Sequence, residues 1–219
     1  MSAPVYASAL EFASGIVLVC AVVTLWRRSV SAIVKALALQ GIALGAAALI
    51  LGVHQHDGGL IAVAALVVAI KGGVVPKLIG RVVAGDPGSR EAAPRINVPA
   101  SLVGAGALTF LAYGATGPVV TLVPTTAGRL IPLGFATLLI GFFAMAVRRK
   151  AVSQIVGLLL VDNGIALVAF LATSGVPFVV ELGASLDVLL LVVVLRVLAA
   201  RMGSKFAVLD LDQLRDLHD

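Results

Sequence analysis

The stretch that decides the fold reads AVSQIVGLLLVDNGIALVAFLAT, from residue 151 to residue 173. It is an almost unbroken apolar run, and about 20 such residues suffice for a helix to cross the hydrocarbon core of a bilayer. Its middle nevertheless holds Asp162. A carboxylate there costs roughly 2.5–3.5 kcal/mol on insertion scales, so it is usually kept for a pathway, a relay or a partner. The stretch predicts a membrane-spanning helix with a functional acid inside it.

The composition of the whole chain agrees, because 60% of its 219 residues are hydrophobic and only 12% are charged. We predict an all-α integral membrane protein with about seven transmembrane helices. They cover residues 5–26, 30–53, 59–83, 99–113, 130–147, 151–173 and 177–200. The fourth is the weakest, since Gly114, Gly117 and Pro118 interrupt it, although residues 119–123 could extend it. If it does not cross, the count falls to six.

Basic residues indicate the orientation, because Lys and Arg collect in short cytoplasmic loops. They follow the first, third, fifth and seventh predicted helices, whereas the alternate connections carry only Arg129. This pattern predicts an N-terminus outside and a cytoplasmic C-terminus, and it explains the net charge of +5 without a nucleic-acid partner. No Lys or Arg precedes the first helix, which is the reverse of a signal peptide, so we expect this helix in the mature protein.

One polar segment divides the chain into parts. Residues 84–98, rich in Gly and Pro, form a cytoplasmic linker between a front unit of three helices, 1–83, and a rear unit of four, 99–200. The cytoplasmic tail, 201–219, has leucines three apart and predicts an amphipathic helix that lies on the membrane or docks on a partner.

A short repeat links the two units. The sequence Gly-Ile-Ala-Leu follows an Arg pair at residues 41–44 and again at residues 164–167. It is compatible with two parallel three-helix units, as in transport proteins, and equally with chance in a chain rich in these residues.

Of the ionisable residues inside predicted helices, four are candidates for function: Lys71, Asp162, Glu181 and Asp187. With a helical rise of about 1.5 Å per residue, Lys71, Asp162 and Asp187 lie about 15–18 Å deep, and Glu181 only about 6 Å from the outer edge. The simpler interpretation is ion pairs that fasten helices or bind a neighbouring subunit. The alternative is a chain of protonatable groups that carries ions, and four such groups exceed what fastening needs.

The backbone next to Lys71 has its own signal. Gly72, Gly73 and Pro76 follow the lysine, and proline removes the hydrogen bond to the carbonyl of Gly72. We therefore predict a kinked helix with a freed carbonyl beside the charge, as at backbone that lines a cavity.

Motifs for self-contained catalysis are missing from the sequence. The single Cys20 cannot ligate an iron–sulfur cluster alone, and no phosphate loop, dinucleotide fingerprint or catalytic triad is found. His54, His56 and Asp57 form a loop that is weak as a metal site and is better explained as solvated. We expect no cofactor, no metal and no catalytic residue, so any redox chemistry must lie on another chain.

Several motifs together resemble one family, component E of hydrogenase-4. In the rear unit they are Arg148-Arg149, Gln154-Ile155-Val156-Gly157, Asp162-Asn163-Gly164, Val180-Glu181-Leu182-Gly183, Asp187, Leu209-Asp210-Leu211-Asp212 and Leu214. In the front unit they are Gln40 and Lys71 ahead of Val74-Val75-Pro76. The resemblance covers nearly the whole chain.

This resemblance implies a membrane subunit of hydrogenase-4 and formate-hydrogenlyase-like complexes, which are similar to respiratory complex I. By it, Asp162 and Glu181 take two acidic positions of the proton path, Asp187 is a third matching acid, and Lys71 matches the family lysine. One departure is that the family typically has Glu at Asp162, so the shorter side chain needs an extra water for a direct relay. Another is Ala166, where some relatives have a polar residue.

Three functional hypotheses follow. The first is a non-catalytic, multi-pass subunit in a prokaryotic cell membrane that couples electron transfer in partner chains to proton or sodium movement. Its partners would be antiporter-like membrane subunits and a hydrogenase-type peripheral arm. The second is a structural anchor without an ion path, and the third is an independent cation transporter.

Overall fold

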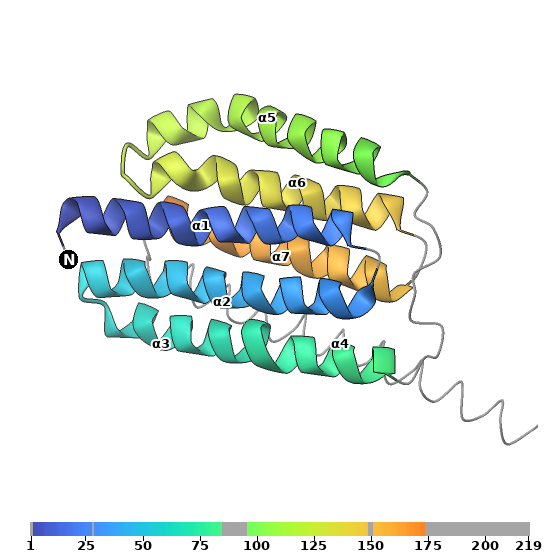
Figure 1. Ribbon diagram of the computed structural model, residues 1–219. Helices are drawn as coiled ribbons and strands as arrows, with labels where there is room; N and C mark the ends of the chain where they lie inside the picture. Colours follow the sequence, from blue (N-terminus) through green and yellow to red (C-terminus); the bar gives the residue numbers. More distant parts are fainter. Residues whose placement is uncertain (1, 28, 85–95, 149–150, 174–219) are drawn as a thin grey trace, which may run out of the picture. The chain divides into compact units, whose positions relative to one another are not determined.

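The computed structural model describes residues 2–27, 29–84, 96–148 and 151–173, and within them the chain is helical with short turns and no strand (Figure 1). The helices are α1 (Ala3–Trp26), α2 (Val30–Gln55), α3 (Gly58–Val67), the π-helix η1 (Val68–Val74), α4 (Val75–Ala84), α5 (Val98–Leu122), the 3-10 helix η2 (Gly128–Leu130), α6 (Ile131–Val147) and α7 (Ala151–Thr173). The prediction of an all-helical chain is thus confirmed for these residues.

Six helical stretches among the described residues are long and apolar enough to cross a membrane. They match the first six predicted helices, with α3, η1 and α4 forming the third, and α7 has the predicted bounds. The seventh predicted helix, 177–200, and the tail, 201–219, lie outside the described residues.

The fourth predicted helix requires a correction, because α5 continues to Leu122 instead of weakening after residue 113. Asn97 caps its start by accepting a hydrogen bond from the amide of Ala100 at 3.0 Å. Pro118 lies inside the helix near its end, where the missing N–H removes a single bond, to the carbonyl of Gly114. Breaking the helix would leave several backbone groups unpaired among apolar neighbours, so continuing it is favourable.

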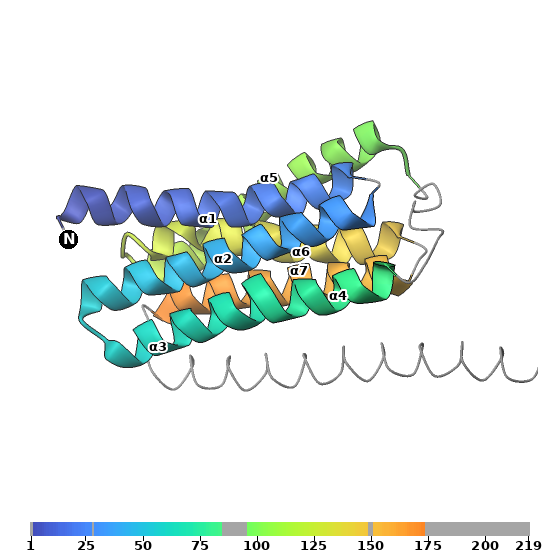
Figure 2. The same ribbon diagram turned by 60° about the horizontal axis from the view of Figure 1, so that its bottom comes forward.

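Successive long helices run in opposite directions, so the ends of α1, α4 and α6 and the starts of α2, α5 and α7 lie at the same end of the helical arrangement (Figure 1). Among the described residues, α2 contacts α1, the α3–η1–α4 run and α7. The helix α6 contacts α1, α5 and α7, while α5 lies at the edge against α6 and α1. Figure 2 shows α2 between α1 and the α3–η1–α4 run, with α7 close to both α2 and α6.

A cluster of buried apolar residues lies towards the turn between α2 and α3. It contains Tyr6, Leu10, Leu44, Leu51, Leu60, Leu167 and Leu171, which come from α1, α2, α3 and α7. The polar groups described below lie nearer the middle of the same helices.

The helices α6 and α7 pack with their backbones in close contact. A Cβ atom at Gly141 would lie 2.6 Å from the amide nitrogen of Val161, and one at Gly164 would lie 2.5 Å from that of Leu138. Only glycine allows this approach. The spacing of seven residues between Gly134 and Gly141, repeated between Gly157 and Gly164 on α7, was the available sequence signal.

Candidate functional site

The site begins with the irregular backbone around Lys71. In η1 the amide of Val75 donates to the carbonyl of Ile70, five residues earlier, rather than to the carbonyl four residues earlier. Pro76 follows and has no N–H to donate, so the backbone ladder is interrupted one turn after the lysine. The sequence predicted a kink with a freed carbonyl here, and the structure has a π-helical segment at this place. Such segments occur often at functional sites.

Lys71 extends from this segment to Asp162 on α7. Its Nζ donates a hydrogen bond to Oδ2 of Asp162 at 2.6 Å, which makes a salt bridge between residues 91 positions apart. The lysine side chain is 7% exposed and the aspartate side chain 19%. Two of the four predicted charges, one from the front unit and one from the rear, therefore form a single ion pair.

A second polar contact lies one residue away. Nδ2 of Asn163 donates to Oε1 of Gln40 at 2.8 Å, and Nε2 of Gln40 donates to the carbonyl of Val17 at 2.9 Å. Gln40 is fully buried and Asn163 is 2% exposed. The hydrogen bonds connect α1, α2 and α7 through uncharged groups, next to the ion pair between η1 and α7.

The helix α2 also contacts the backbone of Lys71. A Cβ atom at Gly41 would lie 2.5 Å from the carbonyl carbon of Lys71 and 2.7 Å from the amide nitrogen of Gly72. Because real Cβ atoms do not come this close, glycine is required at this crossing. Gly45 meets the same run of helix, because a Cβ atom there would lie 3.1 Å from the carbonyl oxygen of Ala64.

The other two predicted site residues, Glu181 and Asp187, lie outside the described residues. Of the residues now found at the site, Gln40 and Asn163 had been noted only as parts of family motifs. The predicted site residues were all charged, so the contact between these two uncharged side chains was not predicted. An amide inside an apolar run, at Gln40 and again at Asn163, was the signal that could have found them.

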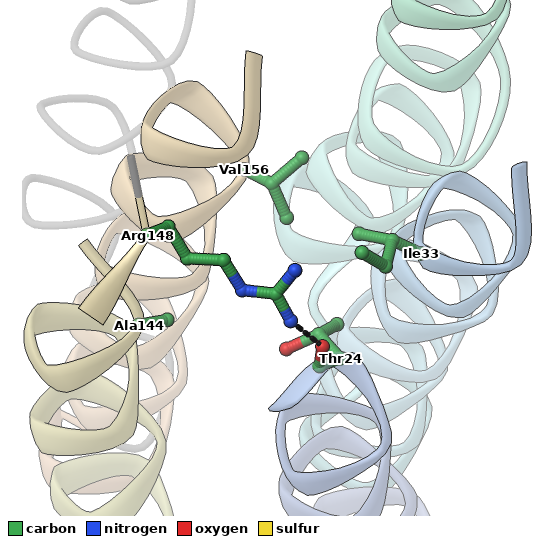
Figure 3. Close-up of a pocket in the computed structure, with 5 residues that line it drawn as sticks. All are labelled: Thr24, Ile33, Ala144, Arg148 and Val156. Atoms are coloured by element: carbon green, nitrogen blue, oxygen red, sulfur yellow. Dashed lines mark hydrogen bonds between the residues drawn. The ribbon is translucent and has the colours of Figure 1, made fainter. Parts of the chain in front are cut away.

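Arg148, at the end of α6, is the other buried cation that the structure describes. We had counted it among the loop charges, but it is only 6% exposed. Its Nη2 donates to the carbonyl of Thr24 (Figure 3). It also donates, at 3.3 Å, to the carbonyl of Arg27, and both carbonyls lie at the end of α1. Burial lowers the pKa of this guanidinium from its ordinary value, yet arginine stays charged in proteins.

These contacts make Arg148 a cap for α1. The last carbonyls of a helix lack partners within the helix and carry partial negative charge, so a cation there is favourable. Figure 3 shows the guanidinium in a small pocket with Ile33, Ala144 and Val156 around it.

The His54–Asp57 turn has a structural explanation. The ring of His54 stacks on that of Tyr6 with centroids 3.9 Å apart. His56 ends α2 in a left-handed conformation, and Asp57 caps α3 by accepting from the amides of Gly59 and Leu60. Among the described residues, no group of three or more His, Cys, Asp or Glu is placed to hold a metal ion.

The fold and the site define the class of protein. It is an all-α protein whose described part has six helices long and apolar enough to cross a membrane, and an ion pair and an amide pair join these helices. Over 211 residues the chain is 46% identical to a protein from Mycobacterium tuberculosis (strain ATCC 25618 / H37Rv) that is named uncharacterized protein Rv0085. The alignment covers 96% of each chain, and the chain belongs to the same family as that protein. No family model matches the chain, and no solved structure matches it.

Proposed function

We propose that this chain is a multi-pass membrane subunit of a complex I-like hydrogenase or related oxidoreductase complex, similar to component E of hydrogenase-4. In this role Lys71 and Asp162 contribute charge to a path for protons or sodium ions, and electron transfer takes place on partner chains. The observation that carries the proposal is the 2.6 Å ion pair in the interior of apolar helices. A charge pair at that depth is expensive to keep and is typical of ion pathways.

The proposed topology places the N-terminus outside and the basic end of the bundle in the cytoplasm. Two observations support it. The helices alternate in direction, and the basic residues Arg27, after α1, and Arg81, near the end of α4, lie at the same end of the bundle. The partners are antiporter-like membrane subunits and a hydrogenase-type peripheral arm. Glu181 and Asp187 extend the path in the rear unit, and the membrane is the prokaryotic plasma membrane.

The interior around the ion pair supports a relay of short range. Here α2 and η1 each supply one polar side chain, Gln40 and Lys71, and α7 supplies two, Asp162 and Asn163. Asp162 keeps the greater exposure of the pair, so it is the member that water reaches more readily. Water can therefore connect this carboxylate to the next protonatable group.

The test uses the assembled complex in its native membrane. Asp162→Asn, Lys71→Met and Glu181→Gln are compared with Glu11→Gln, which alters an exposed acid on α1. We expect normal assembly on a native gel, with loss of ion uptake into inverted vesicles during electron transfer for the first three variants and unchanged uptake for the control. Unchanged uptake in Asp162→Asn and Lys71→Met would refute the proposed relay.

A structural anchor is the second candidate, and the same ion pair favours it because it joins helices from the two units. In that case the charge variants lose the complex from the native gel rather than losing ion uptake alone. Co-purification of the intact chain in mild detergent identifies the partners, and we expect a nickel–iron large subunit among them. An independent cation transporter would instead move ions when the purified chain alone is placed in liposomes.

A further inference from the structure

Two consecutive uncharged residues of α2, Gln40 and Gly41, contact the backbone of Lys71 and the residue next to Asp162. Gly41 faces the backbone of Lys71, and Gln40 is hydrogen-bonded to Asn163, the neighbour of Asp162. Neither contact is explained by the ion pair itself. Both lie at the same level of the bundle, since they come from adjacent positions of one helix.

The contact at Gly41 determines the position of the Lys71 backbone, from which the side chain extends. With no side chain at residue 41, the carbonyl of Lys71 can approach the axis of α2 until a Cβ atom would lie only 2.6 Å from its oxygen. A larger residue would push η1 outward and carry the lysine with it. By contrast, a Cβ atom at Gly73, two residues further along the same segment, would meet nothing within 4 Å.

The contact at Gln40 determines how α7 is rotated. Adjacent residues of a helix project about 100° apart, so holding Asn163 against α2 fixes the direction in which Asp162 projects. The second hydrogen bond of Gln40, to the carbonyl of Val17, holds its amide in place from the other side. A rotation of α7 that moved Asp162 away from Lys71 would break the Asn163–Gln40 bond.

We infer that Gln40 and Gly41 are positioning residues for the ion pair: Gly41 seats the backbone of Lys71, and Gln40, through Asn163, orients Asp162 towards it. The geometric claim stands on the contacts, while its importance for ion movement rests on the proposed function. The competing explanation is that the amide pair only fastens α2 to α7, with no effect on the charges.

The two explanations predict different values for one quantity, the loss of stability caused by Asp162→Asn when the amide pair is absent. In purified full-length protein, the shift in unfolding midpoint caused by Asp162→Asn is measured in two backgrounds, native and Gln40→Leu/Asn163→Leu. The double background replaces both amides by apolar groups of similar shape, so that no buried amide is left without its partner. We expect the shift to fall to less than half of its native value. An equal shift in both backgrounds would overturn the inference.

A control background tests whether the loss of any buried polar group reduces the midpoint shift caused by Asp162→Asn. Thr137→Val removes a buried hydroxyl that donates only to the carbonyl of Leu133 in its own helix. We expect Asp162→Asn to cause the native shift in this background. A reduced shift here as well would show that the measurement reports general loosening and would overturn the inference.

Exchange of the two amides provides a rescue. Gln40→Asn shortens one side chain and should reduce the Asp162-dependent shift, whereas Gln40→Asn/Asn163→Gln restores the combined length and should recover it. This comparison also decides the question if the apolar double variant does not fold, with recovery of folded yield as the readout. Failure of the exchanged pair to recover either quantity counts against positioning.

Gly41→Ala and Gly73→Ala test the other part of the inference, that Gly41 positions the backbone of Lys71. We expect the first to reduce the Asp162-dependent shift by at least half and the second to leave it unchanged, and equal effects would overturn the role of Gly41. These measurements do not involve ion transport. If Asp162→Asn leaves ion uptake intact while the midpoint shifts behave as expected, the proposed function fails and the positioning inference stands.

Discussion

Removing one member of the Lys71–Asp162 ion pair deprives the other charge of a 2.6 Å contact inside the bundle. Breaking a buried pair in this way costs about 3–5 kcal/mol. Because the side chain of Asp162 is 19% exposed and water can screen it, we expect the lower end, about 3 kcal/mol, for either Lys71→Met or Asp162→Asn. The direct attraction, about 6 kcal/mol at an effective dielectric constant near 20, is an upper limit.

Removing both charges has a different consequence. The double variant Lys71→Met/Asp162→Asn removes both charges of the described ion pair, so neither of these two charges stays buried after the other is lost. We therefore expect it to lose no more than about 3 kcal/mol rather than the sum of the two single losses, which is about 6 kcal/mol. The coupling free energy between the two residues should be about 3 kcal/mol.

The assay is reversible unfolding of the purified chain in mixed micelles, with the free energy of unfolding measured for the native protein, both single variants and the double variant. Glu11→Gln, at an exposed acid, is the control and should change the free energy by less than about 0.5 kcal/mol. Additive losses in the double variant would refute the reasoning, because they would mean that the two charges do not stabilise one another.

Three further variants address the contacts that hold the helices. Asp57→Ala should lower the free energy of unfolding by about 1 kcal/mol by removing the cap of α3, and Asp57→Asn should retain most of it; equal losses would exclude capping. Gly164→Ala should lower the free energy of unfolding by about 1–3 kcal/mol, because its Cβ atom would meet the backbone of α6. Gly106→Ala, where a Cβ atom meets open space, should be neutral or stabilising, and a larger loss at Gly106 than at Gly164 would contradict the packing. Arg148→Met should cost about 1.5–3 kcal/mol through the lost bonds to the end of α1, as seen in the thermal midpoint, and a neutral result would exclude the capping role.

Much of the fold could be predicted because a single physical rule determines it. A helix that crosses a bilayer needs about 20 apolar residues, and chain segments of that length are visible without knowledge of any contact. At α5 the predicted bounds, 99–113, were too short, and the structure has the extension that the sequence left open, with the helix ending at Leu122. Among apolar neighbours, an open backbone is more expensive than a helix with one missing hydrogen bond.

The site was only half predictable, and the reason is the difference between a charge and an amide. Lys71 and Asp162 could be identified from the sequence because each is costly in an apolar helix whatever its partner is. That they meet depends on how η1 and α7 lie side by side, which no local pattern encodes. Gln40 and Asn163 are cheaper to bury, so their positions carry little signal until the hydrogen bond between them is seen.

That hydrogen bond gives the weak sequence repeat a physical meaning. Gln40 immediately precedes Gly-Ile-Ala-Leu on α2, and Asn163 immediately precedes the second copy on α7, so the two amides occupy matching positions. In addition, α1 contacts α6 while α2 contacts α7, which is the pairing expected when two related antiparallel helix pairs meet at equivalent faces. If the two helix pairs are related copies, matching positions meet at the axis between them, and an amide suits such a place because it can both donate to and accept from its own counterpart. A carboxylate there would face a like charge, whereas Asp162, one position earlier on α7, pairs with the opposite charge of Lys71 on η1.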